Sequence, residues 1–249
     1  MAATGVSAAG DTVLRVQGLR KLFTGFAALA GVDLAVAPGE IRSVIGPNGA
    51  GKTTLFNLVT GLHRPTSGRI LFDGRDITGL APPRIVRAGV ARAFQIVNLF
   101  PGLPALENVR LACQARDLRA PWVELARRAE EILRQVGLGE KAGAPARELS
   151  HGEQRRLEIG IALGTAPRLL LLDEPMAGLN AVETREISDL ILELGRRCTL
   201  LLIEHDLDVV MRLSTRITVL HQGEVLAEGT PGEIRENAEV RRTYLGGSL

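Results

Sequence analysis

A glycine-rich segment of the chain has the residue types and spacing of a phosphate-binding loop. It reads Gly46-Pro47-Asn48-Gly49-Ala50-Gly51-Lys52-Thr53 and fits the pattern G-x-x-x-x-G-K-[ST]. Residues 41–45 before it predict a strand, and residues 54–60 after it predict a helix. Glycines let successive N–H groups turn toward one anion, and the helix adds its positive end. We expect Lys52 to neutralise the β- and γ-phosphates of a nucleotide and Thr53 to hold Mg²⁺. An ordinary glycine-rich turn is the alternative.

Two acidic residues end an apolar run later in the chain. Asp173 and Glu174 follow the four leucines 169–172, which predict a strand buried on both faces. Ligands in open α/β sheets lie outside the carboxyl ends of the strands. Asp173 is therefore expected to reach Mg²⁺, directly or through water, and Glu174 to polarise a water molecule for attack on the γ-phosphate. The alternative is a pair of solvated acids at a strand end that Pro175 terminates.

A third segment, residues 149–154, predicts the start of a helix. Ser150 and Glu153 have the spacing of a capping box at the start of a helix over 154–163. The N-terminus of such a helix offers a binding site for an anion, and Gly152 lets a ligand approach the backbone closely. A well-capped helix without a ligand is the alternative reading.

The order of these three segments resembles that of ABC-type ATPases. Residues 149–154 are similar to the family signature L-S-G-G-Q; His151 and Glu153 depart from it, whereas Ser150 and Gly152 keep it. The resemblance covers essentially the whole chain from about residue 12. It implies that ATP is held between the phosphate-binding loop of one chain and the signature of another, in a head-to-tail homodimer or with a homologous subunit.

The resemblance also implies roles for residues that carry no signal alone. Gln95 matches the residue that senses the γ-phosphate and the metal, His205 the switch histidine, Asn180 a position in the D-loop, and Phe23 the aromatic residue that stacks on adenine. Otherwise Gln95 would be a surface residue, Phe23 a core residue with Phe26 nearby, and His205 a hydrogen-bonded strand-end histidine. The implied catalytic residues are Glu174, His205 and Gln95; those that bind ATP are Phe23, Gly46, Pro47, Asn48, Gly49, Ala50, Gly51, Lys52, Thr53, Thr54, Ser150, Gly152 and Glu153; those that bind Mg²⁺ are Thr53, Gln95 and Asp173.

Several phrases further resemble the ATPase subunits of branched-chain amino acid importers. They lie at residues 89–95, 174–180, 227–231 and 244–246. The implied function is ATP hydrolysis that powers such an importer. The lipopolysaccharide-export ATPase and urea or amide importers have similar phrases and stay as alternatives. A nontransport ABC switch and a P-loop small-molecule kinase are more distant ones.

The expected fold class is α/β: a P-loop NTPase of the ABC ATPase type, with a RecA-like core, an antiparallel β subdomain and a helical subdomain. We expect a disordered tail over 1–11 and one ABC ATPase domain over 12–249, with the helical subdomain at about 96–164. Within it, Pro121 predicts the start of a helix whose apolar face includes Trp122 as a packing residue. The hairpin-like turn 221–223 and a short helix after Thr230 are expected near the end.

Composition bounds the partners. The net charge of +2 gives no electrostatic case for nucleic-acid binding, so no nucleic-acid partner is expected. The chain has no apolar run of membrane-spanning length and no signal-peptide pattern, and Cys113 and Cys198 lack metal-site spacing. The resemblance therefore implies two separate membrane permease subunits, an indirect partnership with a periplasmic or extracellular solute-binding protein, and a peripheral location on the cytoplasmic face of the inner membrane.

Overall fold

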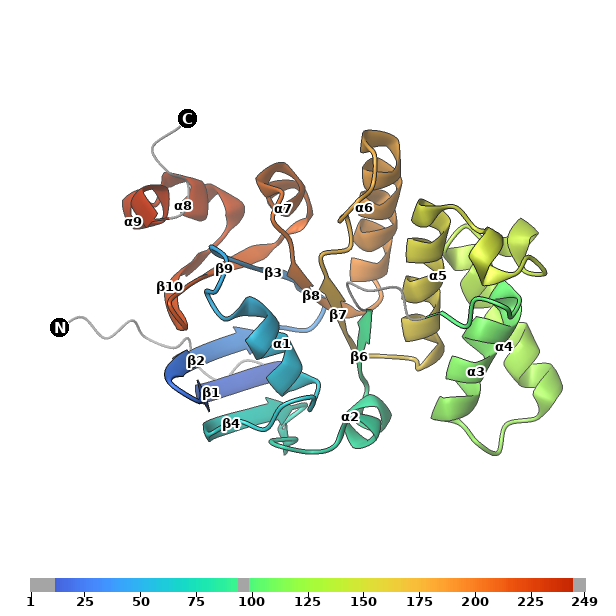
Figure 1. The fold of residues 1–249 in the computed structure, drawn as a ribbon, viewed down its shortest axis with the longest axis horizontal. Helices are drawn as coiled ribbons and strands as arrows, with labels where there is room; N and C mark the ends of the chain where they lie inside the picture. Colours follow the sequence, from blue (N-terminus) through green and yellow to red (C-terminus); the bar gives the residue numbers. More distant parts are fainter. Residues whose placement is uncertain (1–11, 94–98, 244–249) are drawn as a thin grey trace.

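A computed structural model describes residues 12–93 and 99–243. Figure 1 shows two β-sheets with helices around them and a group of helices to one side. The strands are β1 (Leu14–Phe23), β2 (Phe26–Val36), β3 (Ile41–Ile45), β4 (Ser67–Phe72), β5 (Arg75–Asp76), β6 (Val90–Ala93), β7 (Leu169–Asp173), β8 (Thr199–Ile203), β9 (Arg216–His221) and β10 (Glu224–Gly229). The α-helices are α1 (Lys52–Val59), α2 (Pro82–Ala88), α3 (Ala105–Arg116), α4 (Trp122–Gln135), α5 (His151–Gly164), α6 (Ala181–Gly195), α7 (Leu207–Leu213), α8 (Pro231–Glu236) and α9 (Ala238–Thr243), and two 3₁₀ turns are η1 (Gly139–Lys141) and η2 (Ala146–Glu148).

The larger sheet places the predicted phosphate-site strands side by side. Its order is β10-β9-β3-β8-β7-β6; the strands from β9 to β6 pair in parallel, and β10 is an antiparallel edge. Leu169 and Leu171 pack in the core between the two sheets, whereas Leu170 and Leu172 face the helices on the opposite side. Burial on both faces explains the uninterrupted apolar run, as the sequence predicted.

The smaller sheet is antiparallel, with the order β2-β1-β4-β5. Helix α1 lies beside it in Figure 1, and the core that joins the two sheets includes Leu55, Phe56 and Val59 of this helix. The helix that follows the phosphate-binding loop is thus held from both sides by packed side chains, which fixes the direction in which its first residue points.

Helices α3, α4 and α5 form the group beside the larger sheet (Figure 1), within the range expected for a helical subdomain. Leu125, Ala129 and Leu133 of α4 are buried, as its periodicity predicted. Trp122 differs from the expectation, because it is 59% exposed and the guanidinium of Arg110 lies over its ring. It is the first residue of α4, and helical side chains point toward the N-terminus, so its ring extends past the end of the helix.

The last part of the chain contains the predicted hairpin and one unpredicted helix. Strands β9 and β10 pair antiparallel around residues 221–223, and Thr230 caps α8. Helix α9 follows α8 and buries Val240 in a small core with Ile217 and Ile234. Among the helices of the described residues, none is long and apolar enough to cross a bilayer.

Candidate active site

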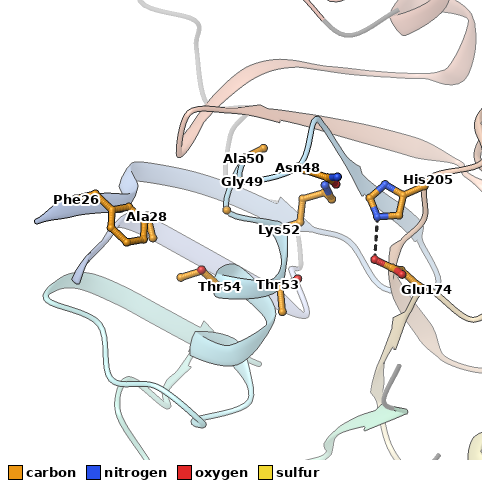
Figure 2. A pocket seen from close by; sticks show the side chains of 11 residues that line it. Phe26, Ala28, Asn48, Gly49, Ala50, Lys52, Thr53, Thr54, Glu174 and His205 are labelled. Carbon is orange, nitrogen blue, oxygen red and sulfur yellow. Dashed lines mark hydrogen bonds and ion pairs between the residues drawn. The ribbon is translucent and has the colours of Figure 1, made fainter. Parts of the chain in front are cut away.

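A pocket opens where the larger sheet meets α1 (Figure 2). It brings together the smaller sheet, the phosphate-binding loop and the loops that follow β7 and β8. Most of the residues expected around a nucleotide therefore meet at one place. The lining residues are Phe26, Ala28, Asn48, Gly49, Ala50, Gly51, Lys52, Thr53, Thr54, Glu174 and His205.

The shape of the phosphate-binding loop depends on two glycines. Gly46 has φ +147°, and a Cβ there would collide with the carbonyl oxygen of Leu220. Gly51 has φ +103°, and a Cβ would lie 2.6 Å from the carbonyl oxygen of Ala28. Gly51 also precedes α1 without a side-chain cap, and the first turn of α1 carries no acidic residue. The loop thus leads into a helix N-terminus suited to an anion.

Lys52 lines this pocket and is 6% exposed. Its ammonium group donates to the carbonyl oxygens of Gly46 at 2.7 Å and Pro47 at 3.0 Å. Burial lowers the pKa of Lys52, while the carboxylates of Glu174 and Asp173 raise it. A phosphate in the loop would compensate this buried positive charge, with the two carbonyl bonds exchanged for bonds to phosphate oxygens.

Asp173 ends β7 and is 2% exposed. Its Oδ2 forms an ion pair with the guanidinium of Arg92 on β6, which also donates to Asn57 Oδ1 at 2.6 Å. Its Oδ1 is buried without a hydrogen-bond partner. An orphaned carboxylate oxygen next to a hydroxyl-bearing loop fits Mg²⁺, which prefers oxygen ligands and is completed by water and phosphate. The described residues contain no group of three or more His, Cys, Asp or Glu that would hold a metal alone.

Glu174 and His205 form a pair at the rim of the pocket. His205 Nε2 lies 2.8 Å from Glu174 Oε1, and Figure 2 shows both facing Lys52 and Asn48 of the loop. Glu174 has φ +51°, an unfavourable backbone conformation for a residue with a Cβ. Its N–H donates to the carbonyl oxygen of Ile203 at 2.9 Å. The strained turn thus holds a carboxylate beside a histidine and opposite the proposed phosphate position.

The signature residues lie at the start of α5 and do not line this pocket. Ser150 and Glu153 form the predicted capping box, and Glu153 also accepts from Lys141 at 2.5 Å. Gly152 is buried against α6: a Cβ there would lie 2.8 Å from Glu183 Oε1. Within one chain, these three residues therefore shape and stabilise a helix N-terminus that is separate from the first pocket.

The remaining expectations have different outcomes. Phe26 lines the pocket, whereas Phe23 stacks on Phe26 and contacts His63 edge-on. Asn180 caps α6 by accepting from the N–H groups of residues 182 and 183. Gln95 lies outside the described residues, as do residues 244–246.

Sequence reasoning missed Arg92. The only signal in the sequence was a charged residue within a short strand-like run, and no residue near Arg92 indicates Asp173 as its partner. The bond joins residues 81 positions apart.

Comparison with known proteins agrees with this geometry. Residues 29–177 match the family model described as ABC transporter, and residues 224–248 match the one described as branched-chain amino acid ATP-binding cassette transporter. The chain is 45% identical to the high-affinity branched-chain amino acid transport ATP-binding protein LivG of Escherichia coli (strain K12), over 94% of this chain and 98% of that protein.

Solved structures of ATP-binding cassettes have the same fold. The ADP conformation of MJ1267, an ATP-binding cassette of an ABC transporter, superposes with a TM-score of 0.86 at 32% identity, over 95% of this chain and 100% of that chain. A dimeric, post-hydrolysis structure of the cassette MJ0796 bound to ADP and Pi superposes with a TM-score of 0.77 at 29% identity, over 88% of this chain and 98% of that chain.

Proposed function

The chain belongs to the ABC transporter family, and on that premise we propose that it is the ATP-hydrolysing subunit of a branched-chain amino acid importer. The observation that carries the enzymatic part is the pocket itself. It sets a glycine-shaped anion loop and Lys52 opposite the Glu174–His205 pair. Such a pairing of a phosphate cradle with a base suits attack of water on a bound phosphate.

We propose one role for each polar group of the pocket. The loop N–H groups and Lys52 bind the β- and γ-phosphates. Glu174 orients and deprotonates the attacking water, because its carboxylate faces the phosphate side of the pocket. His205 holds that carboxylate through the 2.8 Å bond and contacts the γ-phosphate. Phe26, 62% exposed in the lining, offers its ring to adenine.

Mg²⁺ fits the oxygen atoms available beside the loop. The Thr53 hydroxyl and Asp173 Oδ1 are the groups that would hold it, with Gln95 as a further ligand by resemblance. When bound, the ion neutralises phosphate charge. The guanidinium of Arg92 balances the charge of the Asp173 carboxylate from the side of Oδ2.

The separate positions of the two helix N-termini support a two-chain site. The N-terminus of α1 opens into the pocket, whereas Ser150 at the N-terminus of α5 does not. A head-to-tail dimer, either of identical chains or with a homologous subunit, would bring Ser150 and Gly152 of one chain to the nucleotide of the other. Glu153 contributes by holding the cap.

Mixing two inactive variants tests this arrangement. Lys52→Ala removes the phosphate cation, and Ser150→Asp preserves the helix cap but adds a negative charge at the proposed phosphate contact. In a mixed dimer one site carries both defects and the other carries neither, so ATPase activity should reappear on mixing. Unchanged thermal stability of Ser150→Asp is the control. Mixed dimers that form but remain inactive would contradict the trans site.

The proposed transport role needs membrane partners. The chain would bind two permease subunits at the membrane surface, and a solute-binding protein would deliver the substrate to them. The support is the identity to LivG along almost the whole chain together with the match at residues 224–248. A lipopolysaccharide exporter, a urea or amide importer and a nontransport switch are the competing assignments.

Reconstitution tells these assignments apart. The chain is combined in vesicles with the permeases and the binding protein that are encoded beside it in the genome. ATP hydrolysis is then measured with leucine, urea or lipopolysaccharide. Stimulation by leucine-like solutes, absent with Glu174→Gln, is the expected result. Stimulation only by urea or by lipopolysaccharide would reassign the transporter, and failure to bind any membrane subunit would contradict the transport role.

A further inference from the structure

A buried carboxylate lies directly behind the catalytic pair. Glu204 follows the last residue of β8, precedes His205 and is 5% exposed. It is not among the residues that line the pocket. A carboxylate at such a buried position is costly unless hydrogen bonds compensate its charge.

The hydrogen bonds of Glu204 reach two different loops. Its Oε1 accepts from the backbone N–H of Met176 at 2.8 Å, and its Oε2 accepts from the N–H of His205 at 3.2 Å. Met176 belongs to the loop after β7, and His205 belongs to the loop after β8. One side chain therefore ties together the two segments that carry the catalytic residues.

This tie acts where the backbone is strained. Glu174 has φ +51°, and its own N–H is bonded to Ile203 at 2.9 Å, on the strand that leads to Glu204. The bond from Met176 to Glu204 holds the same turn two residues later. The conformation that directs the Glu174 carboxylate toward His205 is thus fixed on both sides by the end of β8.

The electrostatic environment agrees with the geometry. Burial raises the pKa of the Glu204 carboxyl, the N–H groups of Met176 and His205 lower it, and the nearby carboxylate of Glu174 raises it. The two N–H donors therefore offset part of the cost of placing a second acid behind the first.

We propose that Glu204 is a positioning residue for ATP hydrolysis, which holds the loops after β7 and β8 in register so that Glu174 and His205 meet. The inference rests on the proposed ATPase function. Glu204 itself does not touch the nucleotide, so its loss should change turnover and leave nucleotide binding intact.

Two substitutions separate hydrogen bonding from simple filling of space. Glu204→Ala removes both acceptors, whereas Glu204→Gln retains one carbonyl oxygen that can accept from Met176. Glu40 provides a control for the loss of a buried carboxylate. It is 8% exposed, accepts from the N–H of Ala37 at 2.7 Å and pairs with the buried guanidinium of Arg42, but it lies before β3, at the opposite end of the strand from the pocket. Glu40→Ala should lower the melting temperature without lowering kcat.

The assay measures kcat, KM for ATP, and hydrogen exchange of the peptide that contains Met176. Glu204→Ala is expected to lower kcat by about 10- to 100-fold, because small misplacements of a catalytic group have effects of this size, and to leave KM within about twofold. Hydrogen exchange at Met176 should accelerate in Glu204→Ala and much less in Glu204→Gln. The kcat of Glu204→Gln should lie between that of the wild type and that of Glu204→Ala.

The outcomes that overturn the proposal are distinct from failure of the proposed function. If the wild type hydrolyses ATP and Glu204→Ala loses only thermal stability, as Glu40→Ala does, then Glu204 is structural. If Glu204→Gln is as inactive as Glu204→Ala despite normal folding, the hydrogen-bond tie is wrong. A wild type that neither binds nor hydrolyses ATP would instead overturn the proposed function.

Discussion

Replacement of Arg92 by methionine should destabilise the nucleotide-free protein strongly. The side chains of Arg92 and Asp173 are 7% and 2% exposed, so the change would leave a buried carboxylate without its cation. Removal of one partner from a buried ion pair costs about 3–5 kcal/mol. For a chain of this size each kcal/mol corresponds to about 2–4 °C, so the melting temperature should fall by about 6–20 °C. Methionine retains much of the volume of the arginine stem, which limits the contribution from a cavity.

A second arginine–aspartate pair provides the control. Arg168 pairs with Asp73 between exposed segments, with side chains 63% and 23% exposed. Arg168→Met should cost less than about 1 kcal/mol, because solvent screens an exposed pair. The melting temperature and the free energy of unfolding of both variants are measured by thermal and urea denaturation, with a chelator present and without nucleotide.

Addition of Mg²⁺ and ATP extends the same test. If the ion binds beside Asp173, it supplies the charge that Arg92→Met has lost, so it should raise the melting temperature of that variant more than that of the wild type. Equal and small losses in the two arginine variants would refute the buried-pair reasoning. A large loss in Arg92→Met with no additional gain from Mg²⁺ would instead refute the proposed position of the ion.

Four further predictions concern the pocket and the thiol of Cys198. Glu174→Gln should bind ATP normally but nearly abolish turnover, since an amide cannot act as a base; hydrolysis near the wild-type rate would contradict the assigned base. Lys52→Ala should weaken binding of a fluorescent ATP analogue, and unchanged affinity would make the loop purely structural. Phe26→Ala should weaken ATP binding by about fivefold or more, since stacking on a base is worth about 1–3 kcal/mol, and should exceed the effect of Phe23→Ala. Burial raises the pKa of Cys198 to about 11, so at pH 8 alkylation by iodoacetamide should be slow in the native protein and fast in urea; rapid native labelling would contradict this burial.

Local sequence determined the parts of the protein whose chemistry is local. The glycines and Lys52 of the phosphate-binding loop, the capping box of Ser150 and Glu153, and the doubly buried strand before Asp173 all follow from residues a few positions apart. In each case the interacting residues lie within one turn or one strand. Their spacing in the sequence therefore determines whether they can form a hydrogen bond or face the core. The family order of these segments was enough to indicate the fold.

Tertiary structure alone decided which distant side chains meet around the pocket. Arg92 meets Asp173 because β6 and β7 pair in parallel, and Glu204 bonds to Met176, 28 residues away, because β7 and β8 end together. Phe26 lines the pocket, whereas Phe23 contacts His63 edge-on, and the sequence alone does not distinguish the two rings. The sequence around an acidic or aromatic residue does not show which distant residue it will contact. Its role depends on burial and on the neighbour that the sheet brings within hydrogen-bond distance.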